Sequence, residues 1–408
     1  MKISASIVLI GLLMTAMESA QSEEADGDVP AMLTEGKVSL DLRYRYENVE
    51  QDGIDEDASA SLLRSRLNMT SGTINGFTAS LEIDNITAIG VDNYNSTVNG
   101  KTGHPVIADP EGTDLNQLWL KYSSGSFVGT VGRQRILHGN QRFLGGVAWR
   151  QNEQTYDGLR LHLKPDLKLV LDVAYIARVN RIFGPDDAAN PAEFVGDSYV
   201  ARADYTLSDK HKLTGLGYWL EFDPQRGYAP GKNVNNSTNT WGLEYSGKFQ
   251  LVSIAAAWAR QSDAGESSQR YSADYYLLEL SAKLGPVSTK LGREVLGADN
   301  GIGFKTPLAT LHKFQGWADK FLGTPGDGIE DTYVSFGGSL ESSKWMFVYH
   351  KFTAESSSTD FGTELDLVWT WPANKHLTLQ AKYAAFDSDS RDRYSDTDKL
   401  WLTMQLKM

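Results

Sequence analysis

The stretch VSLDLRYRYE (residues 38–47) alternates apolar and polar side chains without a break. A side-chain period of two predicts a β-strand with one apolar and one polar face. Similar stretches of about ten residues recur as far as Met408, and the connections between them are alternately short and long. Strands linked in this way are what a transmembrane β-barrel needs, with tight turns on one side of the membrane and loops on the other. The sequence therefore predicts an all-β chain that spans a membrane.

The same alternation predicts eighteen antiparallel strands. We place them at 37–47, 61–70, 77–84, 115–122, 127–134, 154–163, 167–177, 199–206, 211–221, 240–246, 249–260, 272–283, 287–295, 329–337, 344–352, 363–371, 376–385 and 399–408. Both ends of the barrel then lie on the short-turn side, which is the periplasmic side of bacterial outer-membrane barrels. A soluble sandwich or propeller is the alternative, but such folds rarely show this regular long–short alternation.

The N-terminus resembles a secretory signal. Lys2 supplies the positive charge, residues 7–15 form an apolar core, and Ala20 and Ser22 supply the small side chains at −3 and −1 of a cleavage site near Ser22. The apolar run 3–17 is shorter than the roughly 20 residues of a spanning helix, which argues against a membrane anchor. We expect a signal peptide at 1–22, a polar tail at 23–36 and the barrel at 37–408.

Composition and motifs exclude several functions. The net charge of −13 argues against a nucleic-acid partner, and the chain has no cysteine. Common catalytic and nucleotide-binding motifs are missing, and the seven histidines lack ligand spacing, so we expect no enzyme, cofactor or metal site. Catalytic residues dispersed over the barrel are an alternative. The acidic segment 52–57 could bind Ca²⁺ or bridge lipopolysaccharide, but a solvated loop is favoured.

Arginines gather on the polar face of the predicted strands. A charge on the lipid face would cost ~2–4 kcal/mol at the membrane midplane, so these side chains should point into the lumen. Twelve of the eighteen arginines lie between residues 43 and 202. The predicted pore-lining and anion-binding residues are Arg43, Arg45, Arg64, Arg66, Arg133, Arg135, Arg142, Arg150, Asp157 and Arg160. Such arginines either attract anions, as in anion pores, or brace the wall by pairing with inward-facing acids.

The long connection 296–328 is unusually apolar for a loop. Its large apolar residues are Phe304, Leu308, Leu311, Phe314, Trp317 and Phe321. Exposed loops do not leave so much apolar surface in water. We expect it to fold into the barrel mouth as a constriction, with Phe314, Trp317, Asp319 and Phe321 as constriction residues. Packing against neighbouring loops is the alternative.

Two segments carry a family resemblance. The first comprises GRQRIL (132–137), QRF (141–143), WRQ (149–151) and TYDG (155–158), and the second comprises FKTP (304–307) and FQGWADKF (314–321). Both resemble the alginate-export family of outer-membrane barrels. The resemblance implies an eighteen-stranded barrel whose arginine-rich pore passes anionic saccharide in the exporters. It carries over to Arg133, Arg142, Arg150 and Asp157 of the first motif, and to Trp317 and Asp319 of the second.

We therefore expect a porin-like channel in a Gram-negative outer membrane. Its solutes would be small and hydrophilic, with a preference for anions or anionic saccharides. Its other partners would be membrane lipid and lipopolysaccharide. The alternatives are a dedicated exporter of an anionic polysaccharide such as alginate, which would need periplasmic export partners, and a plugged structural or adhesive barrel.

Overall fold

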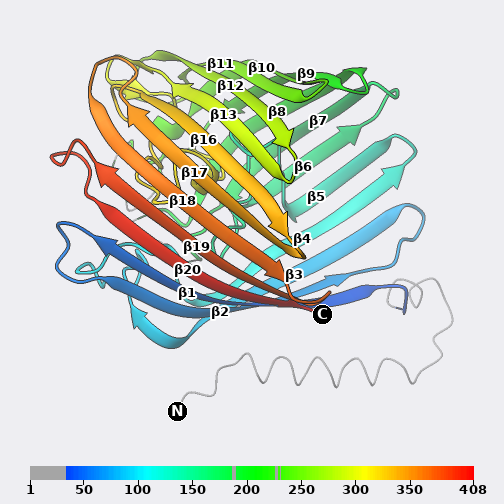
Figure 1. Cartoon of the computed structure of the whole chain (residues 1–408). Coiled ribbons are helices and arrows are strands. Elements are labelled where there is room, and N and C mark those ends of the chain that lie inside the picture. The colour runs from blue at the N-terminus through cyan, green and yellow to red at the C-terminus, as the bar shows by residue number, and fades with distance from the viewer. Residues whose placement is uncertain (1–33, 186–189, 226–227, 230) are drawn as a thin grey trace.

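The computed structural model describes residues 34–185, 190–225, 228–229 and 231–408. Eighteen strands form one closed antiparallel sheet, which confirms the predicted count and fold (Figure 1). The barrel strands are β1 (Lys37–Gln51), β2 (Ala58–Thr70), β3 (Phe77–Asn93), β4 (Gly112–Ser124), β5 (Phe127–Gln134), β6 (Thr155–Leu163), β7 (Leu169–Asn180), β8 (Glu193–Ser208), β9 (His211–Leu220), β10 (Thr238–Phe249), β11 (Val252–Asp263), β12 (Ser272–Leu284), β13 (Val287–Leu296), β16 (Ile329–Leu340), β17 (Ser343–Thr353), β18 (Asp360–Pro372), β19 (Leu377–Ser388) and β20 (Thr397–Lys407). The expected signal peptide and most of the polar tail lie outside the described residues.

The barrel closes through the pairing of β1 with β20. Their antiparallel register runs from Asp41 opposite Lys407 to Gln51 opposite Thr397, and β1 pairs with β2 on its other side. No free edge remains, as the hydrocarbon core requires, because unpaired backbone groups there would lack hydrogen-bond partners.

The two faces of the sheet follow the alternation of the sequence. On β1, Arg43 and Arg45 are buried, whereas Tyr44 and Tyr46 are only half-buried. Large apolar side chains are exposed on the outer face around the barrel, among them Leu118, Leu159, Trp219, Trp241, Leu278 and Leu402. This outer surface is the apolar band that faces lipid.

Some strands are longer than the sequence pattern indicates. β3 continues to Asn93 instead of ending near residue 84, and β8 begins at Glu193 instead of near 199. The extra residues lie at the loop ends of these strands. Beyond the membrane the outer face need not be apolar, so hydrogen-bonded pairing continues after the alternation has stopped.

Two long connections fold inward. We call residues 135–154, between β5 and β6, the first inner loop, and residues 297–328, between β13 and β16, the second inner loop. The second contains the short hairpin β14 (Ala298–Asp299) and β15 (Ile302–Gly303) and the 3₁₀ turn η2 (Leu311–Lys313), and a further turn, η1 (Val234–Asn236), precedes β10. Within the described ranges, no helix has the length and apolarity needed to cross a membrane.

Candidate functional site

The first inner loop is fastened to the barrel wall by two arginines of β1. The Arg43 guanidinium donates to the carbonyl oxygens of Ala148 (3.0 Å) and Arg150, and to Oε1 of Gln151 (2.8 Å). Arg45 donates to the carbonyl oxygen of Trp149 at 2.8 Å and lies over that indole ring, 4.2 Å from its centroid. Two predicted pore arginines therefore hold a loop that crosses the lumen from β5 to β1.

Arg66 and Arg135 join the same loop to β2 and β3. Arg66 donates to both carboxylate oxygens of Asp84 at 2.6 Å and to Glu153 at 2.8 Å. Arg135 donates to Glu153 at 2.5 Å and also to Glu82. Burial opposes ionisation of Glu153, but the two guanidinium groups lower its pKa to about 2. This carboxylate at the end of the first inner loop is thus a buried, charged anchor.

The other predicted arginines also have carboxylate partners. Arg64 lies 3.1 Å from Asp41. Arg133 forms a bidentate pair with Asp157, at 2.8 and 3.0 Å. Arg160 pairs with Asp172. These pairs neutralise much of the basic wall and brace it, while the assignment of these arginines as anion-binding residues stays a prediction.

The two inner loops meet in the middle of the lumen. Arg142 donates to Gln315 at 3.0 Å and lies 3.1 Å from Glu294 on β13. Thr310 donates to Gln141 at 2.7 Å, and the two loop backbones are in contact because a Cβ on Gly145 would clash with Thr310. The φ angles of Gln141 and Gln315 are positive, at 71° and 50°. Such backbone is costly for residues other than glycine and persists where surrounding contacts hold it.

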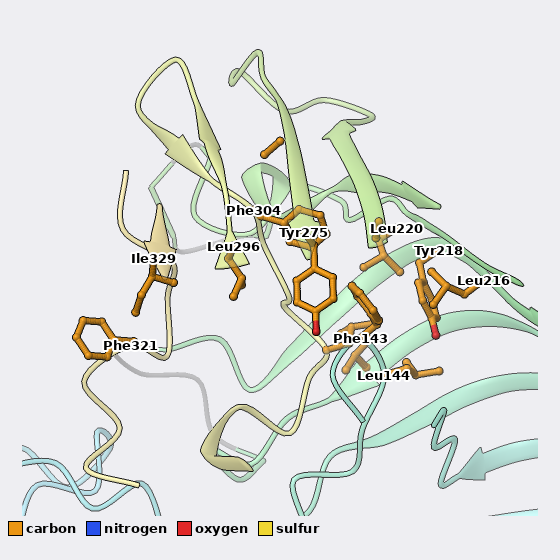
Figure 2. Packing of buried hydrophobic residues seen from close by; sticks show 14 of the residues in the cluster. Phe143, Leu144, Leu216, Tyr218, Leu220, Tyr275, Leu296, Phe304, Phe321 and Ile329 are labelled. Carbon is orange, nitrogen blue, oxygen red and sulfur yellow. The ribbon is translucent and has the colours of Figure 1, made fainter. Parts of the chain in front are cut away.

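Aromatic packing attaches the inner loops to the far wall. Phe143 of the first inner loop stacks on Tyr218 of β9, with ring centroids 5.6 Å apart, and meets Tyr275 of β12 edge-on at 5.4 Å. The ring of Phe304 in the second inner loop also packs on Tyr275, with ring centroids 5.8 Å apart (Figure 2). Phe321, at the other end of that loop, packs on Phe352, Phe361 and Phe386 of the wall.

The predicted constriction residues all belong to the second inner loop and lie against the wall. Trp317 and Phe321 are buried, and Phe314 is half-buried beneath the Arg142 guanidinium. Asp319 accepts from Arg150 of the first inner loop at 3.3 Å and from Lys399 of β20 at 3.2 Å. The motif residues Arg142, Arg150, Trp317 and Asp319, far apart in sequence, therefore come together where the loops join.

The sequence reasoning missed several residues of this junction, namely Glu47, Trp149, His312, Lys382, Lys399 and Trp401. A signal for some of them was present. Trp401 and Lys399 lie on the polar face of the last strand, opposite its run of leucine and methionine. A tryptophan at a strand position whose side chain faces the lumen indicates that a loop packs against the inside of the wall there.

The second inner loop separates two cavities. An inner cavity of about 320 Å³ lies against β12, β13, β16 and β17, and its lining includes Lys290, Lys313, Phe314, Trp317 and Tyr333. An outer cavity of about 370 Å³ is lined by Arg181, Phe194, Gln269, Lys305 and Leu322 among others. Residues of the second inner loop therefore form part of the wall of both cavities.

Three lysines of the second inner loop, Lys305, Lys313 and Lys320, have no carboxylate within 4 Å among the described residues. Lys305 donates to Asn235 and Gln269, Lys313 to the carbonyl oxygen of Asn140 (2.9 Å), and Lys320 to Thr397 (2.8 Å). Burial lowers the pKa of both Lys305 and Lys320 to about 8. These ammonium groups are partly desolvated and would gain from an anion.

In the part of the chain that the structure describes, no group of three or more histidine, aspartate and glutamate side chains is arranged to hold a metal ion.

Comparisons with known proteins agree with this architecture. The family model for alginate export matches residues 35–250, and no curated protein matches the sequence. Crystal structures of outer-membrane channels share the fold. OccAB2 of Acinetobacter baumannii is 15% identical over 93% of this chain and 99% of its own, with a TM-score of 0.70. OpdO of Pseudomonas aeruginosa is 14% identical over 93% and 98%, with a TM-score of 0.67. OpdK of the same species, solved with vanillate, is 14% identical over 92% and 99%, also with a TM-score of 0.67.

At these identities the solved structures establish the fold alone, whereas the family match spans more than half of the chain. The closed barrel, its apolar outer band and the inward-folded loops all fit that match. The chain belongs to the alginate-export family and is a porin-like channel of the Gram-negative outer membrane.

Proposed function

We propose that this channel passes small organic anions, carboxylates and uronic-acid-like saccharides among them, in preference to cations. The observation that carries the proposal is the outer cavity. Among the described residues, its lining contains two cations, Arg181 and Lys305, and no aspartate or glutamate. A low-dielectric cleft lined by one sign of charge concentrates solutes of the opposite sign at its mouth.

The path inward continues this charge pattern. Lys313 lines the inner cavity, and burial together with the charge of Lys290 lowers its pKa. Lys290 is paired with Glu279 at 2.6 Å, whereas Lys313 has no carboxylate within 4 Å among the described residues and would gain from an anion. The acids of both inner loops that face the wall, such as Glu153 and Asp319, are already paired with cations. The lining of the inner cavity also includes Glu279, Glu294 and Asp331, which lie against Lys290, Arg142 and His350. The cations along the route that support the proposal are therefore Arg181, Lys305 and Lys313.

The two loops support small solutes over a polymer. They touch each other through Thr310 and Gln141 and divide the lumen into cavities of a few hundred Å³. A dedicated exporter of alginate-like polysaccharide would need these contacts to open along its whole path. We also propose that the chain acts without catalysis, as a diffusion channel.

Planar-bilayer recording tests the proposal. Under a KCl gradient the reversal potential should show preference for chloride, and the variant K305Q/K313Q/K320Q should lose most of that preference. K375Q, which changes an exposed lysine in the turn 373–376, is the matched control. Cation preference in the unaltered protein would overturn the proposal.

Solute uptake by proteoliposomes supplies the second measurement. Glucuronate and vanillate, the latter chosen because it accompanies OpdK, should enter faster than neutral or cationic solutes of similar size. Equal rates for all charges would point to an unselective pore.

A further inference from the structure

Lys382 of β19 is a buried cation of the barrel wall that is surrounded by aromatic rings. Its Nζ lies 3.5 Å from the ring centroid of Trp317, 4.2 Å from that of Trp149 and 5.4 Å from that of Trp401. It also lies 2.6 Å from Nε2 of His312. The three indoles and the imidazole form what we call the aromatic cage.

With Lys382 as an ammonium group, the hydrogen bonds set the tautomer of His312. An ammonium group has donors only, so Nε2 of His312 must accept from Lys382. The proton of His312 is then on Nδ1, which donates to Oδ1 of Asp319 at 2.7 Å. Burial and the neighbouring lysine charge lower the pKa of His312 to about 3, which keeps the imidazole neutral.

Lys382 forms no ion pair within 4 Å among the described residues. Its charge is stabilised by the faces of the indole rings, which carry negative electrostatic potential, by one imidazole nitrogen, and at longer range by the carboxylates of Asp366 and Asp319. The side chain is buried, with 6% of its surface exposed, so a passing anion does not reach it. Anion attraction, the role expected of an inward-facing lysine, therefore does not explain this residue.

The cage joins four separate parts of the chain. Trp149 comes from the first inner loop, His312 and Trp317 from the second, Trp401 from β20, and the lysine from β19. The Trp149 and His312 rings stack at 4.1 Å with an interplanar angle of 7°, so the two loops contact each other at the cation. Removing the Lys382 ammonium group would leave the aromatic rings in place but take away the cation that all of them contact.

We propose that Lys382 is the positioning residue of the constriction, a built-in cation that holds both inner loops in an aromatic cage and so sets the width and selectivity of the pore. Its effect on transport rests on the proposed function. Its effect on the loops does not, and the experiment measures the two separately.

The test is chemical rescue of K382A. The change to alanine removes a propylammonium group, so n-propylammonium in solution should re-enter the cage, whereas n-propanol and propionate should not. The loop readout is trypsin cleavage after Lys305, Lys313 and Lys320, identified by mass spectrometry. We expect cleavage to be about tenfold faster in K382A and to return towards the wild-type rate with n-propylammonium alone.

Single-channel conductance is the transport readout on the same samples. K382A should show larger and noisier conductance with weaker anion preference, and n-propylammonium should reverse both changes. K212A is the matched control, because Lys212 is a more exposed wall lysine that pairs with Asp204. Heat-dependent migration on gels verifies that each barrel has closed. If K382A does not close, K382M and W317L, each of which removes one side of the contact, replace it.

The outcomes separate the two claims. Rescued protection from trypsin without any anion preference in the unaltered channel would support the cage and overturn the proposed function. Unchanged cleavage and conductance in both K382A and K382M would overturn the cage proposal. So would rescue by n-propanol, because a neutral filler would then suffice.

Discussion

At the scale of single residues, Arg66 is the most heavily paired cation of the wall. It contacts Asp84, Glu82 and Glu153, and 9% of its side chain is exposed. Replacing one partner of a buried charge network leaves the others uncompensated, which typically costs ~3–5 kcal/mol. We expect R66Q to lower the free energy of unfolding by about that amount, measured by urea titration in lipid vesicles.

The control for that prediction is R178Q. The Arg178 side chain is 42% exposed and its ion pairs are screened by water, so the expected loss is below ~1 kcal/mol. A loss of equal size in both variants would show that burial does not decide the stability contribution of these arginines.

Two lysines make anion preference depend on pH. The pKa of both Lys305 and Lys320 is about 8, so both keep their charge below that pH and lose it above. The chloride preference should therefore be full at pH 6 and fall between pH 7 and pH 9. Reversal potentials across this range test the prediction, and K305Q/K320Q should give a flat profile. A fall of the same size in the double variant would assign the titration to other groups.

At the scale of elements, the second inner loop should be separable from the barrel. Leu296 and Ile329, the residues that flank it, are direct partners in the β13–β16 register, so a short link can replace residues 300–325 without disturbing the strands. We expect this deletion to raise conductance severalfold and to admit larger sugars. The measurements are single-channel recording and liposome swelling, with deletion of residues 53–56 as the control.

Gly316 shows why this loop fits only one way. Its φ is +79°, and a Cβ at this position would clash with the Glu364 carboxylate of β18. G316A should therefore displace the neighbouring Trp317 and Ala318, loosening the loop without affecting the barrel. We expect faster trypsin cleavage of the loop with unchanged heat-dependent migration, and G323A, where a Cβ meets open space, should behave as the unaltered protein.

The strands were predictable because each one alternates apolar and polar side chains along its own sequence. All eighteen were located from alternation. The largest errors, on β3 and β8, fall at loop ends beyond the lipid-facing band, and several turn-side boundaries, such as those of β10 and β11, shift by about three residues. The β-bulges between Glu82 and Ile83 and between Asp157 and Gly158 shift the register between strands. No local sequence pattern predicts these shifts.

The site was only half predictable. Inward-facing arginines follow from parity, but their partners do not. Arg43 meets carbonyl groups more than a hundred residues away, and Lys382 meets His312 seventy residues away. Such contacts depend on how far each inner loop reaches across the lumen, which is set by tertiary packing and not by any short segment.

At the scale of the whole molecule, the overall charge and the charge of the outer cavity have opposite signs. The chain is acidic overall, with a net charge of −13, whereas the charged residues in the described lining of the outer cavity are the cations Arg181 and Lys305. Long-range attraction of anions is weakened by salt. We expect chloride preference to decline as KCl is raised from 0.1 to 1 M, measured from reversal potentials at a fixed concentration ratio. A preference that does not change with salt would mean that short-range contacts alone select the ion.

The pairing of β1 with β20 has a consequence for truncated chains. Because the first and last strands seal the sheet, a chain shortened by stalled synthesis or proteolysis would keep an open edge however many of its other strands are correct. Only a chain that contains both β1 and β20 can therefore close the sheet into a ring. Closure of the barrel therefore depends on the first and last strands being present together.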